Sequence, residues 1–204
     1  MEYPVIFQNL IDCFRKIPGI GAKTAERMAY DVLAMKPEEI EKMATSILSV
    51  NQISRCPICG NLTENNELCE ICASEERDHS VVCVVHSPKD VFAFEKMKEY
   101  RGTYHVLNGY ISSNSKNNSF EDVDIPSLIS RIESSEIKEV ILATDSTRDG
   151  TLTTMYIAKL LNEYPNLVVT RLAQGLPNGA QLDYTDELTL FRAFSNRKNV
   201  NENK

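Results

Sequence analysis

The 204-residue sequence contains no long hydrophobic run, and this argues against a helix that crosses a membrane. Its longest apolar stretches, at residues 81–85 and 140–143, are far shorter than the roughly 18 residues that a membrane span needs. The N-terminus also has no basic region followed by an apolar stretch and a small-residue cleavage site. We therefore expect no signal peptide and a cytosolic location.

Recognisable motifs for nucleotide binding and nucleophilic catalysis are missing as well. The stretch 173–180 has two glycines and a proline, but it matches neither G-x-G-x-x-G nor the G-x-x-x-x-G-K-[ST] phosphate loop. We interpret it as a shaped turn. The histidines, His79, His86 and His105, are scattered, so no Ser-His-Asp constellation follows from their spacing.

Positive charge is scarce: 22 Lys and Arg face 29 Asp and Glu, which gives a formal net charge of −7. This balance discourages a simple polycationic nucleic-acid binder. The deficit is concentrated in residues 56–79, with one basic and six acidic residues, whereas residues 1–55 have seven of each. The N-terminal quarter can therefore present a basic face, and nucleic-acid binding is not excluded.

The hydrophobic content of 42% and the charged content of 25% are typical of a globular protein. Apolar spacing of three and four predicts helices at residues 5–17 and 22–35 and a third helix from Pro37, so residues 1–55 are expected to be all-helical.

After the cysteine-rich segment, β-rich runs alternate with helical patterns, which indicates an α/β domain with a mostly parallel sheet. The expected strands are 81–86, 104–107, 140–145 and 167–172; the expected helices lie near 90–100, 126–135, 151–163 and 185–194. We expect an exposed loop at 112–124 and a frayed end at 196–204.

Four of the six cysteines form two C-x-x-C pairs separated by nine residues: Cys56, Cys59, Cys69 and Cys72. Two such knuckles suit a tetrahedral zinc ion with four thiolate ligands and no open position, which is the structural kind of site. The alternative is a set of redox or accidental pairs. Cys13 and Cys83 lie inside apolar patterns and are interpreted as small buried hydrophobic residues.

The segment from Ile17 to Ala25, IPGIGAKTA, joins two amphipathic helices and has the pattern of a helix-hairpin-helix. Both glycines can adopt conformations closed to other residues, and the N–H groups that open the second helix can bind a phosphate oxygen. Lys23 and Arg27 would share one face and add positive charge. The alternative is an ordinary tight turn between packed helices. The predicted DNA-binding residues are Gly19, Gly21, Lys23, Thr24 and Arg27.

Three aspartates are candidate magnesium ligands: Asp90, Asp145 and Asp149. His86 and Asp145 follow two predicted parallel strands, whose carboxyl ends are where open α/β sheets bind ligands. Magnesium prefers oxygen ligands, and a nuclease centre needs converging carboxylates to hold it. The alternative is that Asp145 and Asp149 cap the helix expected near Thr151.

In this order, the hairpin, the four-cysteine segment and the α/β domain resemble the bacterial RecR family of recombination mediators over nearly the whole chain. The resemblance is carried by residues 17–28 (IPGIGAKTAERM), the cysteine segment, YHVL at 104–107, EVILAT at 139–144 and RLAQGLP at 171–177. It implies an α+β, multi-module chain with expected boundaries 1–55 for the hairpin domain, 56–72 for the four-cysteine zinc module, 79–175 for a Toprim domain and 176–204 for a C-terminal helical segment in a subunit contact.

The resemblance also implies a non-enzymatic role. Family members form tetrameric rings around DNA and, with RecO and RecF, help load RecA onto single strands coated with SSB. Lys23 and Arg27 match the family's DNA-contacting positions, and Asp145 and Asp149 are candidates for contacting RecO. Toprim enzymes use a Glu and a D-x-D pair, whereas this chain has His86 and only Asp145 there.

Three hypotheses therefore stand at this point. The first is a DNA-binding adaptor of recombinational repair, associated with the nucleoid. The second is a magnesium-dependent Toprim nuclease or topoisomerase-like enzyme. The third is a structural adaptor that never touches DNA.

Overall fold

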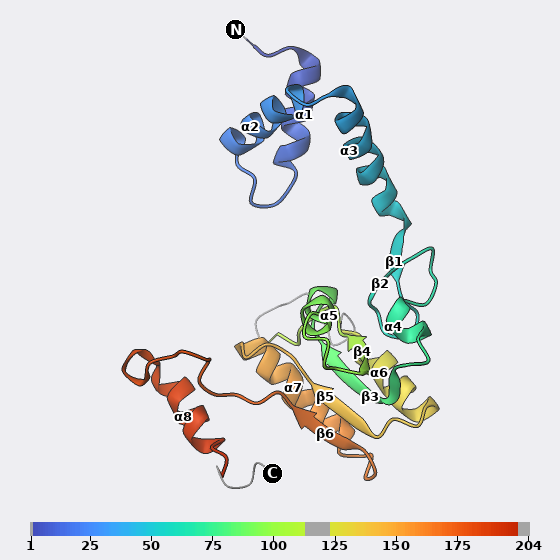
Figure 1. Ribbon diagram of the computed structural model, residues 1–204, viewed down its shortest axis with the longest axis vertical. Coiled ribbons are helices and arrows are strands. Elements are labelled where there is room, and N and C mark those ends of the chain that lie inside the picture. Colours follow the sequence, from blue (N-terminus) through green and yellow to red (C-terminus); the bar gives the residue numbers. More distant parts are fainter. Residues whose placement is uncertain (1, 113–122, 200–204) are drawn as a thin grey trace. The chain divides into compact units, whose positions relative to one another are not determined.

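The computed structural model describes residues 2–112 and 123–199, and the chain divides into two compact units, Met1–Ile53 and Ser54–Lys204 (Figure 1). Most of the expected loop at 112–124 and the last residues of the expected frayed end lie outside the described residues.

The first unit contains three helices, as predicted: α1 (Val5–Arg15), α2 (Ala22–Leu33) and α3 (Pro37–Ser49). Ile11 and Phe14 of α1 pack against Ala25 and Ala29 of α2, and the two alanines are completely buried. Small side chains at these positions let the two helices approach closely. Pro37 occupies the first turn of α3, where its missing N–H costs no hydrogen bond.

The segment after α3 corrects the prediction that residues 1–55 are all-helical. A short 3₁₀ turn, η1 (Val50–Gln52), leads into a strand, β1 (Ile53–Arg55), that pairs with β2 (Leu62–Glu64). The helix α4 (Glu70–Ala73) completes this small cysteine-containing module. Strands of three residues leave almost no periodicity for a sequence pattern to detect.

A four-stranded parallel sheet in the order β4-β3-β5-β6 forms the centre of the second unit. Its strands are β3 (Asp78–Val85), β4 (Gly102–Val106), β5 (Glu139–Leu142) and β6 (Val168–Arg171), which confirms all four expected strands within a few residues. The expected strand at 140–145 ends earlier, at Leu142.

Alternating residues of β3 supply two separate cores. Val82 and Val84 pack with α6 (Ile125–Ser134) and α7 (Arg148–Leu161) on one face of the sheet. Cys83 and Val85 pack with α5 (Pro88–Glu95) on the other face. Helices on both faces explain why the central strand β3 carries an unbroken apolar run at residues 81–85.

The two isolated cysteines have different environments. Cys83 is buried, as predicted. Cys13 is exposed, so the prediction that it is buried was wrong. Its neighbours Ile11 and Phe14 occupy the buried face of α1, and Cys13 falls outside that stripe.

The C-terminal segment comprises η2 (Leu182–Tyr184) and α8 (Glu187–Ser195), close to the expected helix at 185–194. None of the residues of α8 is buried, and Leu188, Phe191 and Phe194 are all more than half exposed. Among the helices in the described part of the chain, none has the length and apolar character to span a membrane.

Candidate zinc centre and DNA-binding hairpin

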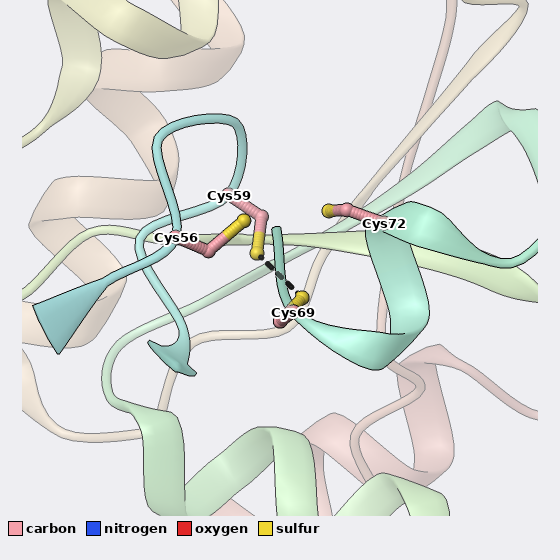
Figure 2. Close-up of side chains that lie close together, drawn as sticks. All are labelled: Cys56, Cys59, Cys69 and Cys72. Atoms are coloured by element: carbon pink, nitrogen blue, oxygen red, sulfur yellow. Dashed lines mark hydrogen bonds between the residues drawn. The ribbon is translucent and has the colours of Figure 1, made fainter. Parts of the chain in front are cut away.

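The four predicted zinc ligands converge on one point, as Figure 2 shows. Their sulfur atoms all lie within 4.8 Å of one another, and all four residues are buried. The Sγ atoms of Cys59 and Cys69 are 3.6 Å apart, which is far too long for a disulfide bond. In the part of the chain that the structure describes, no other group of three or more His, Cys, Asp or Glu side chains converges in this way.

This donor set fits zinc. Four thiolates at about 2.3 Å from a tetrahedral ion are about 3.8 Å from each other, close to the separation of Cys59 and Cys69. Within the cluster, hydrogen bonds from Cys59 and Cys72 lower the pKa of Cys69. Four protein ligands leave no position for water, so the ion would act as a structural cross-link rather than a catalyst.

Backbone hydrogen bonds hold the first knuckle in place. The N–H of Cys56 donates to the carbonyl of Asn61 at 2.7 Å, and the N–H of Gly60 donates to the carbonyl of Cys56 at 2.9 Å. The N–H of Val106, at the end of β4, donates to the carbonyl of Cys59 at 2.8 Å. The zinc knuckle is therefore attached directly to an edge strand of the parallel sheet.

The turn between α1 and α2 has the geometry of a phosphate-binding hairpin. Hydrogen bonds from Ile17 N–H to the carbonyl of Phe14 and from Ile20 N–H to the carbonyl of Ile17 form the turn, both at 3.1 Å. Gly21 is the N-cap residue of α2, and no side chain caps the helix. The first-turn N–H groups of a helix with no capping side chain are suited to an anionic oxygen.

The two glycines of the hairpin play different parts. Gly19 has a φ of +84°, which favours glycine strongly, as expected. Gly21 has a φ of −80°, so the expectation of a special conformation was wrong for this residue. A Cβ atom at Gly21 would nevertheless meet nothing within 4 Å, so the backbone is open on that side. The missing side chain of Gly21 therefore leaves room for another molecule to approach the backbone, and it is not needed to relieve backbone strain.

Lys23 and Arg27 are both exposed and lie four residues apart on α2, as predicted. Thr24 is half-buried. The opposite side of α2 carries the buried Ala25 and Ala29, so the two cations face solvent.

The carboxyl edge of the sheet brings together two of the residues singled out in the sequence and one that was missed. His86 follows β3 and Asp145 lies three residues after β5, and their strands are neighbours. The Tyr110 hydroxyl donates to Oδ2 of Asp145 at 2.7 Å, and its ring stacks on His86 with 3.8 Å between centroids. No spacing rule links Tyr110 to residues so distant in sequence.

The other two aspartates do not join them. Oδ2 of Asp90 accepts hydrogen bonds from the backbone N–H and the hydroxyl of Ser87, at 2.8 and 3.2 Å, and so caps α5. Asp149 lies in the first turn of α7. The predicted capping of this helix was wrong in detail, because α7 begins at Arg148 and its N-cap is Thr147, whose hydroxyl accepts from Gly150 N–H. The three carboxylates form no converging group among the described residues.

Comparison with known proteins assigns all of these segments to one family. Sequence models of protein families match the RecR helix-hairpin-helix at residues 7–50, the RecR four-cysteine zinc finger domain at 53–74, the Toprim domain at 80–173 and the RecR C-terminal segment at 175–198. The "Recombination protein RecR" of Staphylococcus aureus strain JH9 is 46% identical over 198 residues, 97% of this chain and 98% of the relative. That of Ligilactobacillus salivarius is 46% identical over 202 residues, 98% of this chain and 100% of the relative.

The chain belongs to the RecR family. It is therefore a recombination protein of DNA repair and not an enzyme, and its fold is the α+β arrangement of hairpin, four-cysteine zinc finger, Toprim domain and C-terminal segment. In this RecR-family Toprim domain, Oδ2 of Asp145 accepts a hydrogen bond from the Tyr110 hydroxyl, and no group of three acidic side chains converges there among the described residues.

Proposed function

We propose that this RecR-family chain binds DNA through the hairpin residues Gly19, Gly21, Lys23, Thr24 and Arg27. We further propose that, together with RecO and RecF, it helps load RecA onto SSB-coated single-stranded DNA at gaps. The observation that carries the proposal is the N-terminus of α2, where no side chain caps the helix and Lys23 is exposed beside it. A backbone site of this kind holds phosphates without reading bases, which suits a protein that must act at any gap.

The whole chain has a net charge of −7, so most of its surface repels the DNA phosphates. The proposed DNA contact is therefore confined to one small face. A ring of identical subunits would compensate for a weak individual contact, since every hairpin after the first binds at a high effective concentration. The exposed Leu188, Phe191 and Phe194 of α8 support a subunit contact by the C-terminal segment. We propose a tetrameric ring on this basis.

The acidic carboxyl edge of the Toprim sheet is the proposed contact for RecO. Asp145 is exposed and Asp149 is half-buried, and neither forms an ion pair within the described residues. A basic partner would find two carboxylates there, of which Asp145 also accepts the Tyr110 hydroxyl. Replacing both residues by Asn should weaken the complex with RecO in a calorimetric titration while the zinc content stays unchanged. An unchanged affinity for RecO would show that Asp145 and Asp149 do not take part in the contact.

Magnesium has no catalytic part in this proposal. Any binding at Asp145 would be weak, because Oδ2 already accepts the Tyr110 hydroxyl, while Asp90 is engaged with Ser87. The proposed role at DNA gaps places the protein in the cytoplasm, in association with the nucleoid.

The decisive experiment is a salt series of fluorescence-anisotropy titrations with labelled gapped DNA and the zinc-loaded protein. Lys23→Ala combined with Arg27→Ala should lower the affinity for all sequences equally and reduce the slope of log K against log salt by about one for each lost phosphate contact. The matched control removes two exposed lysines of the same unit, Lys36 and Lys42, and should leave the slope nearly unchanged. A slope that is the same in both double variants would refute the placement.

A further inference from the structure

The exposed face of α2 extends beyond the two cations to an aromatic residue, Tyr30. Lys23, Arg27 and Tyr30 are separated by four and three residues, so they lie on one side of the helix, and all three are exposed. At about 1.5 Å per residue, Tyr30 lies roughly 10 Å further along the helix axis than Lys23. Two positive charges are therefore followed, in line, by an exposed aromatic ring.

Neighbouring aromatic residues hold the Tyr30 ring in place. Its centroid is 4.8 Å from that of Phe7 and 6.2 Å from that of Tyr3, and Tyr3 in turn packs edge-on against Phe7 at 5.2 Å. Even so, 48% of Tyr30 and 40% of Tyr3 remain exposed. The ring is thus supported from beneath by Phe7 while much of its surface is available to a ligand.

The acidic residue on this face is already engaged. The Tyr3 hydroxyl donates a hydrogen bond to Oε1 of Glu26, and the Tyr30 hydroxyl is 3.5 Å from that of Tyr3. The donor is a neutral hydroxyl, so Glu26 keeps its negative charge while its side chain is held against the aromatic cluster. The Tyr3 side chain therefore ties the only acidic group between Lys23 and Tyr30 to the aromatic cluster.

We propose that Tyr30 stacks on an unpaired base of a DNA strand whose phosphates lie along Lys23 and Arg27. This proposal rests on the proposed function, since it needs the hairpin to bind DNA, and it narrows the substrate to DNA with a single-stranded part. A cationic track combined with an exposed aromatic ring is how proteins bind single strands, because every base offers a flat face for stacking. In a duplex those faces are covered by neighbouring bases. With about 3.4 Å per stacked nucleotide, the base on Tyr30 lies about three nucleotides from the phosphate at Lys23.

The test compares two DNAs in titrations with the full-length, zinc-loaded protein: a duplex with a ten-nucleotide gap and a blunt duplex of equal length. Tyr30→Leu keeps an apolar side chain on Phe7 but removes the ring, and it should weaken binding to gapped DNA about fivefold to a hundredfold while leaving the blunt duplex unaffected. Tyr30→Phe retains the ring and should bind both DNAs as the unmodified protein does. With 2-aminopurine in the gap, the unmodified protein should quench the fluorescence of the probe and Tyr30→Leu should not.

Three other results would overturn the stacking role. If Tyr30→Leu and the unmodified protein bound gapped DNA equally well, Tyr30 would not stack on a base, although the salt-sensitive binding by the hairpin would still stand. An equal loss on both DNAs, together with a smaller oligomer in sedimentation, would assign Tyr30 to a contact with a second copy of the chain. If the unmodified protein bound neither DNA, the proposed function itself would fail, and the aromatic contact would fail with it.

Discussion

The hydroxyl of Tyr110 donates a hydrogen bond of 2.7 Å to Oδ2 of Asp145, and this contact joins the segment after β4 to the segment after β5. Burial and the bond to Asp145 both raise the pKa of Tyr110, so the phenol keeps its proton at neutral pH and remains a donor. The ring of His86 covers the same tyrosine. Beside Asp145, this edge therefore carries a stacked aromatic pair, and the described residues place no converging group of carboxylates there.

We therefore expect that the protein does not cleave DNA in the presence of magnesium. Gapped plasmid incubated with millimolar magnesium should stay intact with the unmodified protein and also with Tyr110→Phe, in which Asp145 has lost its hydrogen-bond donor. The reason is that Asp90 and Asp149 do not converge on Asp145. Magnesium-dependent nicking that disappears in Asp145→Ala would contradict this expectation and make the protein an enzyme.

Removal of zinc should disorganise the module that contains Cys56 and Cys72 and weaken its attachment to β4. Chelation or Cys59→Ser should release one zinc ion per chain, measurable with a chromogenic indicator, and lower the melting temperature, because metal binding supplies much of the folding free energy of such modules. Cys13→Ser is the matched control, since Cys13 is exposed and lies outside the cluster. Equal zinc content in the two variants would show that Cys59 is not a ligand.

The sequence predicted the parts of this fold whose signals are local. Two C-x-x-C pairs are enough to indicate a zinc site, and the spacing of Ile11 and Phe14 is enough to indicate an amphipathic helix. Both patterns arise from backbone geometry within a few residues. The same spacing predicted that Lys23 and Arg27 share one helix face, but Tyr30 was not among the predicted DNA-binding residues.

Contacts between distant segments left no such signal. Tyr110 and Asp145 are 35 residues apart, and the hydrogen bond from Val106 to Cys59 joins two modules. The conformation of Gly21 was missed for a different reason. A glycine in a turn suggests a positive φ, but of the two hairpin glycines only Gly19 adopts one. The open space at Gly21 depends on the surrounding structure and not on the local sequence.

The two hairpin glycines should respond differently to alanine. Gly21→Ala should fold with normal stability, because its φ of −80° suits alanine and the new Cβ meets nothing within 4 Å. It should nevertheless weaken DNA binding, since the methyl group would lie beside the N–H groups that are proposed to bind a phosphate. Gly19→Ala should instead cost about 1 kcal/mol or more in stability, because alanine is strained at a φ of +84°.

Thermal denaturation and DNA titrations of both glycine variants separate the two effects. A melting temperature lowered by Gly21→Ala as much as by Gly19→Ala would show that the open space at Gly21 is needed for folding. Normal DNA binding by a well-folded Gly21→Ala would show that no phosphate approaches there.

Acid should destabilise the protein through Glu95. The guanidinium of Arg77 donates to Oε1 of Glu95 at 3.0 Å, and the Tyr104 hydroxyl donates to the same oxygen at 2.7 Å. These contacts, chiefly that with Arg77, lower the pKa of Glu95. The folded state therefore binds a proton less readily than the unfolded state, whose Glu has a pKa of about 4.3. The resulting stabilisation is present above about pH 4.3 and is lost as the pH falls through the lowered pKa.

Glu95→Gln should remove this pH dependence and lower stability at pH 7 by on the order of 1 kcal/mol, because Arg77 loses its charged partner. Denaturant unfolding between pH 7 and pH 3 measures both effects. Glu99→Gln removes the same charge from an exposed position nearby and should leave the acid-induced loss of stability in place. If Glu95→Gln and Glu99→Gln both lost stability on acidification in parallel with the unmodified protein, the protons that destabilise the folded state would be taken up by other carboxylates. Arg77 would then be held mainly by the carbonyl oxygens of Tyr100 and Gly102.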